Sequence, residues 1–223
     1  GTVTWIEYDE RVFDGDLVRG DRLMERAPDG TITELWSTWD TFTYIHGETV
    51  MSPDTWWTMG NQLAYDAEND AYVISLRVIH TVVSWSREAK EVNWILGSDS
   101  PSLASDTQFS GQHGLQVLDG GNLLVFDNGT NESASRVLEF EIDETDETAE
   151  VVWQYDPETT LYSYVLGDAI RLDNGNTIAI FGTEKTIQEV TQDKQVVWEM
   201  SFADSTLIGF AQYHEQVVNE PTP

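Results

Sequence analysis

The sequence contains no cysteine, only three lysines, and no apolar run close to the about 20 residues of a membrane-spanning helix. Without cysteine, disulfides and thiolate metal sites are excluded. There is also no phosphate-binding glycine loop, no Gly-x-Ser-x-Gly turn and no His-Glu-x-x-His helix, so nucleotide hydrolysis, serine-hydrolase chemistry and zinc proteolysis have no sequence basis. The 223 residues are 40% hydrophobic and 11% aromatic, which is enough for a sizeable core and predicts no membrane span.

Basic residues are scarce compared with acidic ones. Forty Asp and Glu residues against eleven Lys and Arg give a formal net charge of −29. A field of that sign repels nucleic acid and anionic membranes, so we expect neither as a partner. The acidic loops at 66–70 and 143–147 could bind calcium, but both lack the glycine and the terminal glutamate of an EF-hand loop. We therefore favour a hydrated acidic surface and expect no metal or other cofactor.

Four segments of the chain close with a tryptophan in the same local setting, at Trp36, Trp94, Trp153 and Trp198. Each segment has the pattern of strand, turn and strand, and a second hairpin precedes the last three. Two hairpins per repeat make a four-stranded blade. Stacked blades would bury these indoles between neighbours.

The sequence predicts an all-β fold, a β-propeller of four-stranded blades with about three and a half blades present. We expect a single arc over residues 1–215 and a C-terminal tail over 216–223. Within the arc, a partial blade covers 1–57 and complete blades cover about 61–96, 113–155 and 168–200. Because closed propellers have about four to eight blades, we expect further upstream sequence, another chain or self-association to complete the ring.

The run at 111–129, which contains Gln-His-Gly and Phe-Asp-Asn-Gly, is followed by Ser-Arg-Val-Leu-Glu at 135–139. Together with the segments at 61–66, 73–77, 171–177, 188–191 and 197–199, it resembles the arylsulfotransferase (arylsulfate sulfotransferase) propellers. The resemblance covers about residues 20–200. It implies a six-bladed ring and a periplasmic or extracellular location.

The resemblance also implies an activity, the transfer of a sulfuryl group from a phenolic sulfate ester to a phenol acceptor through histidine, without a nucleotide donor. His113 stands in the Gln-His motif of the family, and Arg136 matches an arginine that can bind sulfate oxygens. A neutral imidazole can attack sulfur and carry the group as a sulfohistidine. His113 and Arg136 are therefore the catalytic candidates.

Two departures from the family pattern favour an alternative. Met59 stands where the family has a histidine, and residues 161–167, before Asp168, contain none where active members carry the nucleophile. The alternative is a catalytically silent propeller that serves as an extracellular binding or assembly module.

Four further residues are candidates for binding the substrate. Arg77 and Arg171 lie on or next to inner strands and could add positive charge to the channel, or they could pair with surface carboxylates. Tyr162 and Tyr164 could stack on a phenolic ring or pack between blades.

The remaining histidines and the glycosylation motifs have simpler interpretations. His46, His80 and His214 could substitute for the missing histidines, but each lacks an orienting partner in sequence and is interpreted as structural. Asn128 and Asn131 begin sequons that would be glycan acceptors in a secreted protein, although Asn128 with its following glycine is also a good turn.

Overall fold

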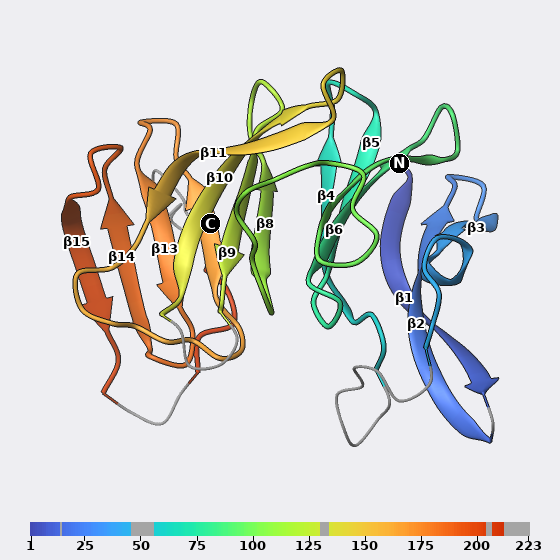
Figure 1. Ribbon diagram of the computed structural model, residues 1–223, viewed down its shortest axis with the longest axis horizontal. Coiled ribbons are helices and arrows are strands. Elements are labelled where there is room, and N and C mark those ends of the chain that lie inside the picture. The colour runs from blue at the N-terminus through green and yellow to red at the C-terminus, as the bar shows by residue number, and fades with distance from the viewer. Residues whose placement is uncertain (14, 46–55, 130–133, 204–206, 212–223) are drawn as a thin grey trace, which may run out of the picture.

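The computed structural model describes residues 1–13, 15–45, 56–129, 134–203 and 207–211. These residues form four antiparallel sheets that stand side by side (Figure 1), and their single helical element is the short 3-10 turn η1 (Thr38–Asp40). None of the described segments forms a helix with the length and apolar character needed to cross a membrane. The all-β fold predicted from the sequence is confirmed.

Each sheet is a meander in which strand order follows chain order. The first sheet contains β1 (Val3–Phe13), β2 (Asp16–Arg26) and β3 (Ile32–Ser37). The second contains β4 (Gly60–Asp66), β5 (Ala71–Leu76), β6 (Thr81–Ser86) and β7 (Val92–Gly97). The third contains β8 (His113–Val117), β9 (Leu123–Asp127), β10 (Arg136–Asp143) and β11 (Thr148–Tyr155). The fourth contains β12 (Asp168–Arg171), β13 (Thr177–Phe181), β14 (Thr186–Val190) and β15 (Val196–Ser201).

The first sheet is a blade with three described strands. In the other sheets the fourth strand carries a bulge opposite the third, with Asn93, Val152 and Val197 as the extra residues. The same bulge lies in β3, where Leu35 is the extra residue opposite β2. Strands β1 to β3 therefore correspond to the second, third and fourth strands of a blade.

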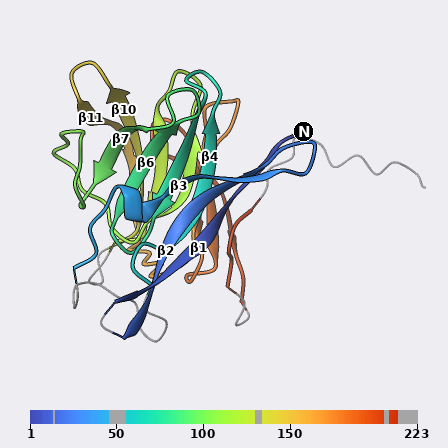
Figure 2. The same cartoon turned by 90° about the vertical axis from the view of Figure 1, so that its right-hand side faces the viewer.

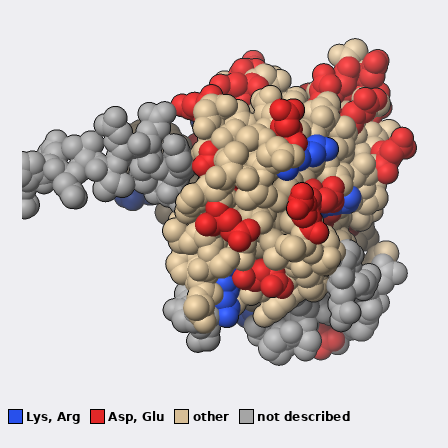
Figure 3. Space-filling view, turned by 90° about the vertical axis from the view of Figure 1, so that its left-hand side faces the viewer, with Lys and Arg blue, Asp and Glu red and all other residues tan. Residues whose placement is uncertain are grey.

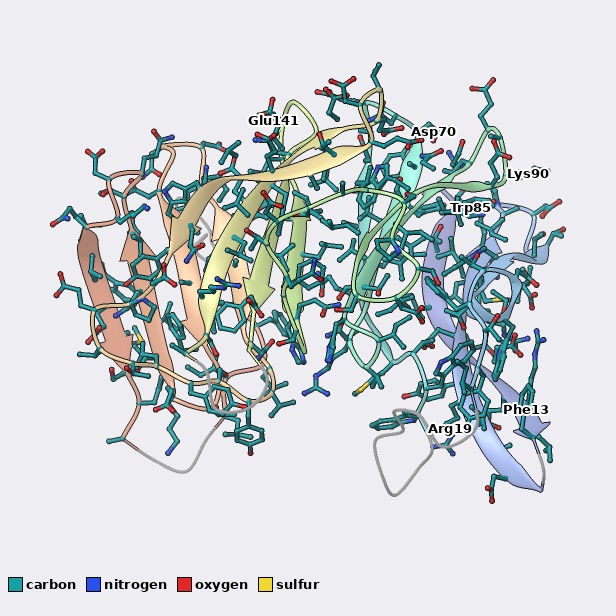
Figure 4. The ribbon with its side chains drawn as sticks, viewed as in Figure 1. Phe13, Arg19, Asp70, Trp85, Lys90 and Glu141 are labelled. Carbon is teal, nitrogen blue, oxygen red and sulfur yellow. The ribbon has the colours of Figure 1, made fainter. Side chains whose placement is uncertain are left out.

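Hydrophobic clusters fill the space between successive sheets, because the central strands present apolar side chains to both faces. In β9, Leu123 and Val125 pack toward the second sheet, while Leu124 and Phe126 pack toward the fourth. Figure 2 shows the long β1 and β2 strands crossing in front of the second sheet. Trp85, labelled in Figure 4, lies in the cluster between these two sheets.

The exposure of the tryptophan in the last strand of each blade depends on whether another sheet covers it. Trp36 and Trp94 are 6% and 7% exposed and belong to the clusters against the second and third sheets. Trp153 is half-buried against the third cluster. Trp198, on the last sheet, is 43% exposed. Indoles are thus covered where a following sheet is present.

The last strand of the fourth sheet is exposed. All six residues of β15 are exposed, among them Val197 and Met200. Figure 3, which views the molecule from this side, shows acidic side chains scattered over an otherwise uncharged surface with few basic groups. This surface combines apolar exposure with strong negative charge.

Candidate functional site

His113 is the first residue of β8, at the inner edge of the third sheet, where β8 contacts β4 and β12. Gly111 and Gly114 on either side have positive φ angles of 62° and 48°. The pairing of β8 with β9 shifts register between His113 and Leu115. This bulge sets the direction of the half-buried imidazole, because an extra residue breaks the regular alternation of side chains.

Asn128 fixes the tautomer of His113. Its Nδ2 donates to the carbonyl oxygens of Ser163 and Leu166, at 2.5 and 2.7 Å, so its Oδ1 is left to accept from His113 Nδ1 at 2.8 Å. The carbonyl oxygen of Gly111, at 3.1 Å, is a second acceptor for Nδ1. The proton therefore resides on Nδ1 and the lone pair on Nε2. Nε2 accepts a long bond of 3.3 Å from the Leu166 N–H.

The imidazole is held in its neutral form. Burial lowers the pKa of His113, and the positive charge of Arg77 lowers it further, against the opposing effects of the hydrogen bonds to Asn128 and Gly111. At neutral pH the side chain is consequently an uncharged base with its lone pair on Nε2.

Arg77 directly follows β5 and provides positive charge near His113. Its Nη2 donates to the Tyr164 carbonyl oxygen at 3.1 Å. Burial lowers the pKa of Arg77 and the nearby Tyr162 phenol opposes this, but a guanidinium stays protonated in proteins. Tyr162 is half-buried and Tyr164 is 57% exposed. Four of the predicted site residues thus come together around the segment at 162–167.

The position before Asp168 has no room for a side chain. Gly167 has a φ of +109°, and a Cβ atom there would lie 2.4 Å from Phe126 Cε1 and 3.0 Å from the Ile180 carbonyl oxygen. The backbone at residue 167 is therefore one that only glycine adopts without strain.

Asp168, the first residue of β12, was not predicted as a site residue. A Cβ atom at Gly114 would lie 2.6 Å from Asp168 Oδ1, so the carboxyl packs directly against the residue after His113. Burial raises the pKa of Asp168 to about 6, against a hydrogen bond from the Ala169 N–H. In Figure 1 this site lies toward the lower end of the sheets, where β13 ends.

Arg136 begins β10 and is held by an ion pair. Its Nε donates to Asp127 Oδ2 at 2.8 Å, and its Nη2 donates to the Gln108 carbonyl oxygen at 2.8 Å. It lines a hollow of about 540 Å³ together with His80 and Asp156. No described contact joins Arg136 to His113.

Arg171 lies at the far end of β12 from Asp168. Its Nη2 donates to Glu139 Oε2 at 2.8 Å, its Nε donates to Thr177 Oγ1 at 2.9 Å, and its guanidinium covers the Trp153 ring. These contacts tie the third sheet to the fourth. The structure does not bring Arg171 and His113 together.

The other sequence candidates have local contacts. Met59 has a φ of 55°, and its carbonyl oxygen accepts from the Arg77 N–H. His80 has a φ of 51°, and its Nδ1 is 2.9 Å from the Gly111 N–H. Burial lowers the pKa of His80, which makes it a neutral acceptor for that bond. His46 and His214 lie outside the described residues.

Asn128 is a structural residue and not a glycan acceptor. Its side chain is fully buried and its Nδ2 is occupied by two carbonyl oxygens. The second sequon residue, Asn131, lies outside the described part of the chain. In the acidic loops, Asp66 and Asp143 accept hydrogen bonds from backbone N–H groups of their own turns. The described residues contain no group of three or more potential metal ligands.

The sequence pattern of the arylsulfotransferase (ASST) family matches residues 7–220. The arylsulfate sulfotransferase AssT of Lelliottia amnigena is 31% identical over 140 residues, which are 46% of this chain and 23% of that protein. AssT of Escherichia coli O6:H1 is 28% identical over 146 residues, or 48% of this chain and 24% of that protein. Each alignment thus spans about a quarter of the relative.

Solved structures match the fold at low sequence identity. The β-propeller domain of Cps50 (Swd1) from Myceliophteria thermophila has a TM-score of 0.53 at 10% identity and covers 82% of this chain and 56% of that one. A protein from Lactobacillus plantarum has a TM-score of 0.53 at 9% identity, over 92% of this chain and 57% of that one. With the family match over nearly its whole length, the chain belongs to the arylsulfotransferase (ASST) family.

Proposed function

We propose that the protein is an aryl-sulfate sulfotransferase in which His113 Nε2 accepts the sulfuryl group from a phenolic sulfate ester and passes it to a phenol. The observation that carries this proposal is the fixed tautomer of His113. Asn128 Oδ1 accepts from Nδ1, which leaves the Nε2 lone pair available for attack.

In the first step, Nε2 attacks sulfur, an N–S bond forms, and the bond between sulfur and the aryl oxygen breaks. The phenolate departs with the electron pair. The imidazole ring becomes positively charged, and the Nδ1–H bond to Asn128 Oδ1 strengthens as that charge develops. The positive charge of the neighbouring Arg77 stabilises the negative charge on the sulfonate oxygens.

In the second step, the oxygen of an acceptor phenol attacks sulfur and the N–S bond breaks, which returns the electron pair to Nε2. The acceptor loses its hydroxyl proton in this step. The long Leu166 N–H bond to Nε2 is given up when sulfur binds, and the same N–H can then donate to a sulfonate oxygen. Arg136 and Arg171 contribute by fixing the sheets, because their guanidinium groups are engaged with Asp127 and Glu139.

A second candidate function is a catalytically silent binding or assembly module. Its support is that residues 161–167 contain no histidine, where active relatives carry one by resemblance. The two candidates differ in whether His113 alone suffices as a nucleophile.

The test is release of nitrophenolate from 4-nitrophenyl sulfate, with phenol as the acceptor. We expect a stoichiometric burst and a peptide carrying His113 plus one SO₃ group by mass spectrometry. His113→Ala should abolish both in a protein that still folds, whereas His80→Asn, which suits the positive φ at that position, should keep them. A folded wild-type protein without burst or adduct would favour the silent module.

We also propose that another chain or a second copy completes the propeller. The exposed Trp198 and the other exposed residues of β15 support this, since the equivalent indoles Trp36 and Trp94 are covered by a following sheet. A hydrophobic dye should bind the isolated chain, and light scattering should detect assembly. A monomer without dye binding would contradict the proposal.

Family membership further supports a periplasmic or extracellular location. The net charge of −29 supports the expectation that nucleic acid is not a partner. Cell fractionation tests the first proposal and a nucleic-acid binding assay at low salt tests the second.

A further inference from the structure

A second titratable group lies beside His113 and takes no part in the first step. Asp168 Oδ1 packs on Gly114, the residue after His113, and Leu166, whose N–H reaches His113 Nε2, lies two residues before Asp168. The Asp168 carboxyl therefore contacts the residue next to the imidazole, and β12 begins two residues after the N–H that is bound to Nε2.

Asp168 has few polar contacts among the described residues. Its one described hydrogen bond is from the N–H of the next residue, Ala169. None of the ion pairs among the described residues includes it, in contrast to Asp127 and Glu139, which hold Arg136 and Arg171. A partly buried carboxylate without a cationic partner lowers the stability of the folded protein. Its presence on an inner strand therefore points to a functional role.

We propose that Asp168 is the general base that takes the hydroxyl proton of the acceptor phenol in the second step. This inference rests on the proposed function of His113. As the phenol oxygen bonds to sulfur, its proton moves to the Asp168 carboxylate and the N–S electron pair returns to Nε2. The proton then leaves Asp168 for solvent, and the enzyme is back in its starting state.

The groups around Asp168 are suited to this role. Burial raises its pKa to about 6, which places it close to the range where a base works well at neutral pH while remaining mostly ionised. The titratable and charged groups on neighbouring elements are His113 on β8, Asp127 at the end of β9, and Tyr162 and Tyr164 in the segment before β12, with Arg77 bound to the Tyr164 carbonyl oxygen. His113 is neutral, and Asp127 is bound to Arg136.

The test compares the wild type with Asp168→Asn and, as a matched control, Asp173→Asn in the exposed turn after β12. The donor is 4-nitrophenyl sulfate, whose leaving group needs no proton. The acceptors are phenol, which is neutral at neutral pH, and an acidic phenol that is already ionised there. The burst of nitrophenolate reports the first step, and steady-state turnover reports the second.

We expect Asp168→Asn to retain the full burst and to lose about 10²- to 10⁴-fold in turnover with the neutral phenol. With the ionised phenol the deficit should disappear, which a purely structural role would not produce. In the wild type, turnover with the neutral phenol should rise with pH through about 6 and then level off, as the Asp168 carboxyl ionises. Asp173→Asn should match the wild type throughout.

An equal deficit with both acceptors, or no deficit at all, would overturn the role of Asp168 while leaving that of His113 intact. Absence of the burst in the wild type would instead refute the proposed function, and the inference with it. If Asp168→Asn does not fold, the wild-type pH profile decides, because a flat profile with the neutral phenol contradicts a base at this position.

Discussion

Gly167 offers a direct test of how tightly the backbone before Asp168 is constrained. The perturbation is Gly167→Ala. At φ +109° a side chain costs about 1–3 kcal/mol in backbone strain. A Cβ atom 2.4 Å from the buried Phe126 ring forces that ring to move, which costs about another 1–3 kcal/mol. The expected total is about 2–6 kcal/mol, a large part of the stability of a typical domain.

The matched control is Gly120→Ala in the turn after β8. Gly120 has a φ of +87° with no atom within 4 Å of the added Cβ, so it carries the strain without the collision. Urea unfolding followed by tryptophan fluorescence gives both free energies of unfolding. Gly167→Ala should be the more damaging by about 1–3 kcal/mol. Equal losses in the two variants would refute the argument that packing against Phe126 excludes a side chain here.

Further predictions concern two carboxylates. The pKa of Asp168 is about 6 in the folded protein, above its ordinary value of 3.8. Between these two pH values the folded protein therefore binds more protons than the unfolded protein. The free energy of unfolding should fall by up to about 3 kcal/mol as the pH rises from 3.8 to about 6. Asp168→Asn should remove this fall and should be more stable than the wild type at neutral pH. Unfolding curves of both proteins at several pH values check this, and the same pH dependence of stability in both would contradict it. Arg171→Ala leaves Glu139 buried without its cation and should cost about 3 kcal/mol in a thermal or urea unfolding assay. The pair of Arg11 and Asp9, in which the arginine side chain is 46% exposed, gives the comparison, since Arg11→Ala should cost less than about 1 kcal/mol, and similar losses would argue against burial as the cause.

The blades could be predicted from the sequence because their signals are local. Each hairpin has its own turn residues, and the run at 123–126 is apolar on both faces because β9 is covered by a sheet on each side. The tryptophans at the ends of the blades were predicted to lie between neighbours, and Trp36 and Trp94 do so. At these positions the local sequence pattern and the packing of neighbouring sheets favour the same structure.

The site could be predicted only in part, because its contacts join distant residues. His113 was identified from its motif, but its tautomer depends on Asn128, 15 residues away, and its Nε2 contact comes from Leu166, 53 residues away. Asn128 is in the same sequence run as His113, so the signal was present but was interpreted as a turn and a sequon. Arg171 could not be separated from Arg77 in sequence, because its partner Glu139 is 32 residues away on another sheet.

The face-to-face order of the sheets has a consequence for how motion is distributed along the chain. Each hydrophobic cluster joins only neighbouring sheets, so local opening begins at the two terminal sheets and reaches the third sheet only after an interface is lost. Amide hydrogen exchange should therefore be slowest in the central strands of the second and third sheets, β5, β6, β9 and β10, and faster toward β1 and β15. His113 begins the third sheet and Asn128 directly follows its strand β9, so the orientation of the imidazole can persist through many fluctuations at the ends of the stack.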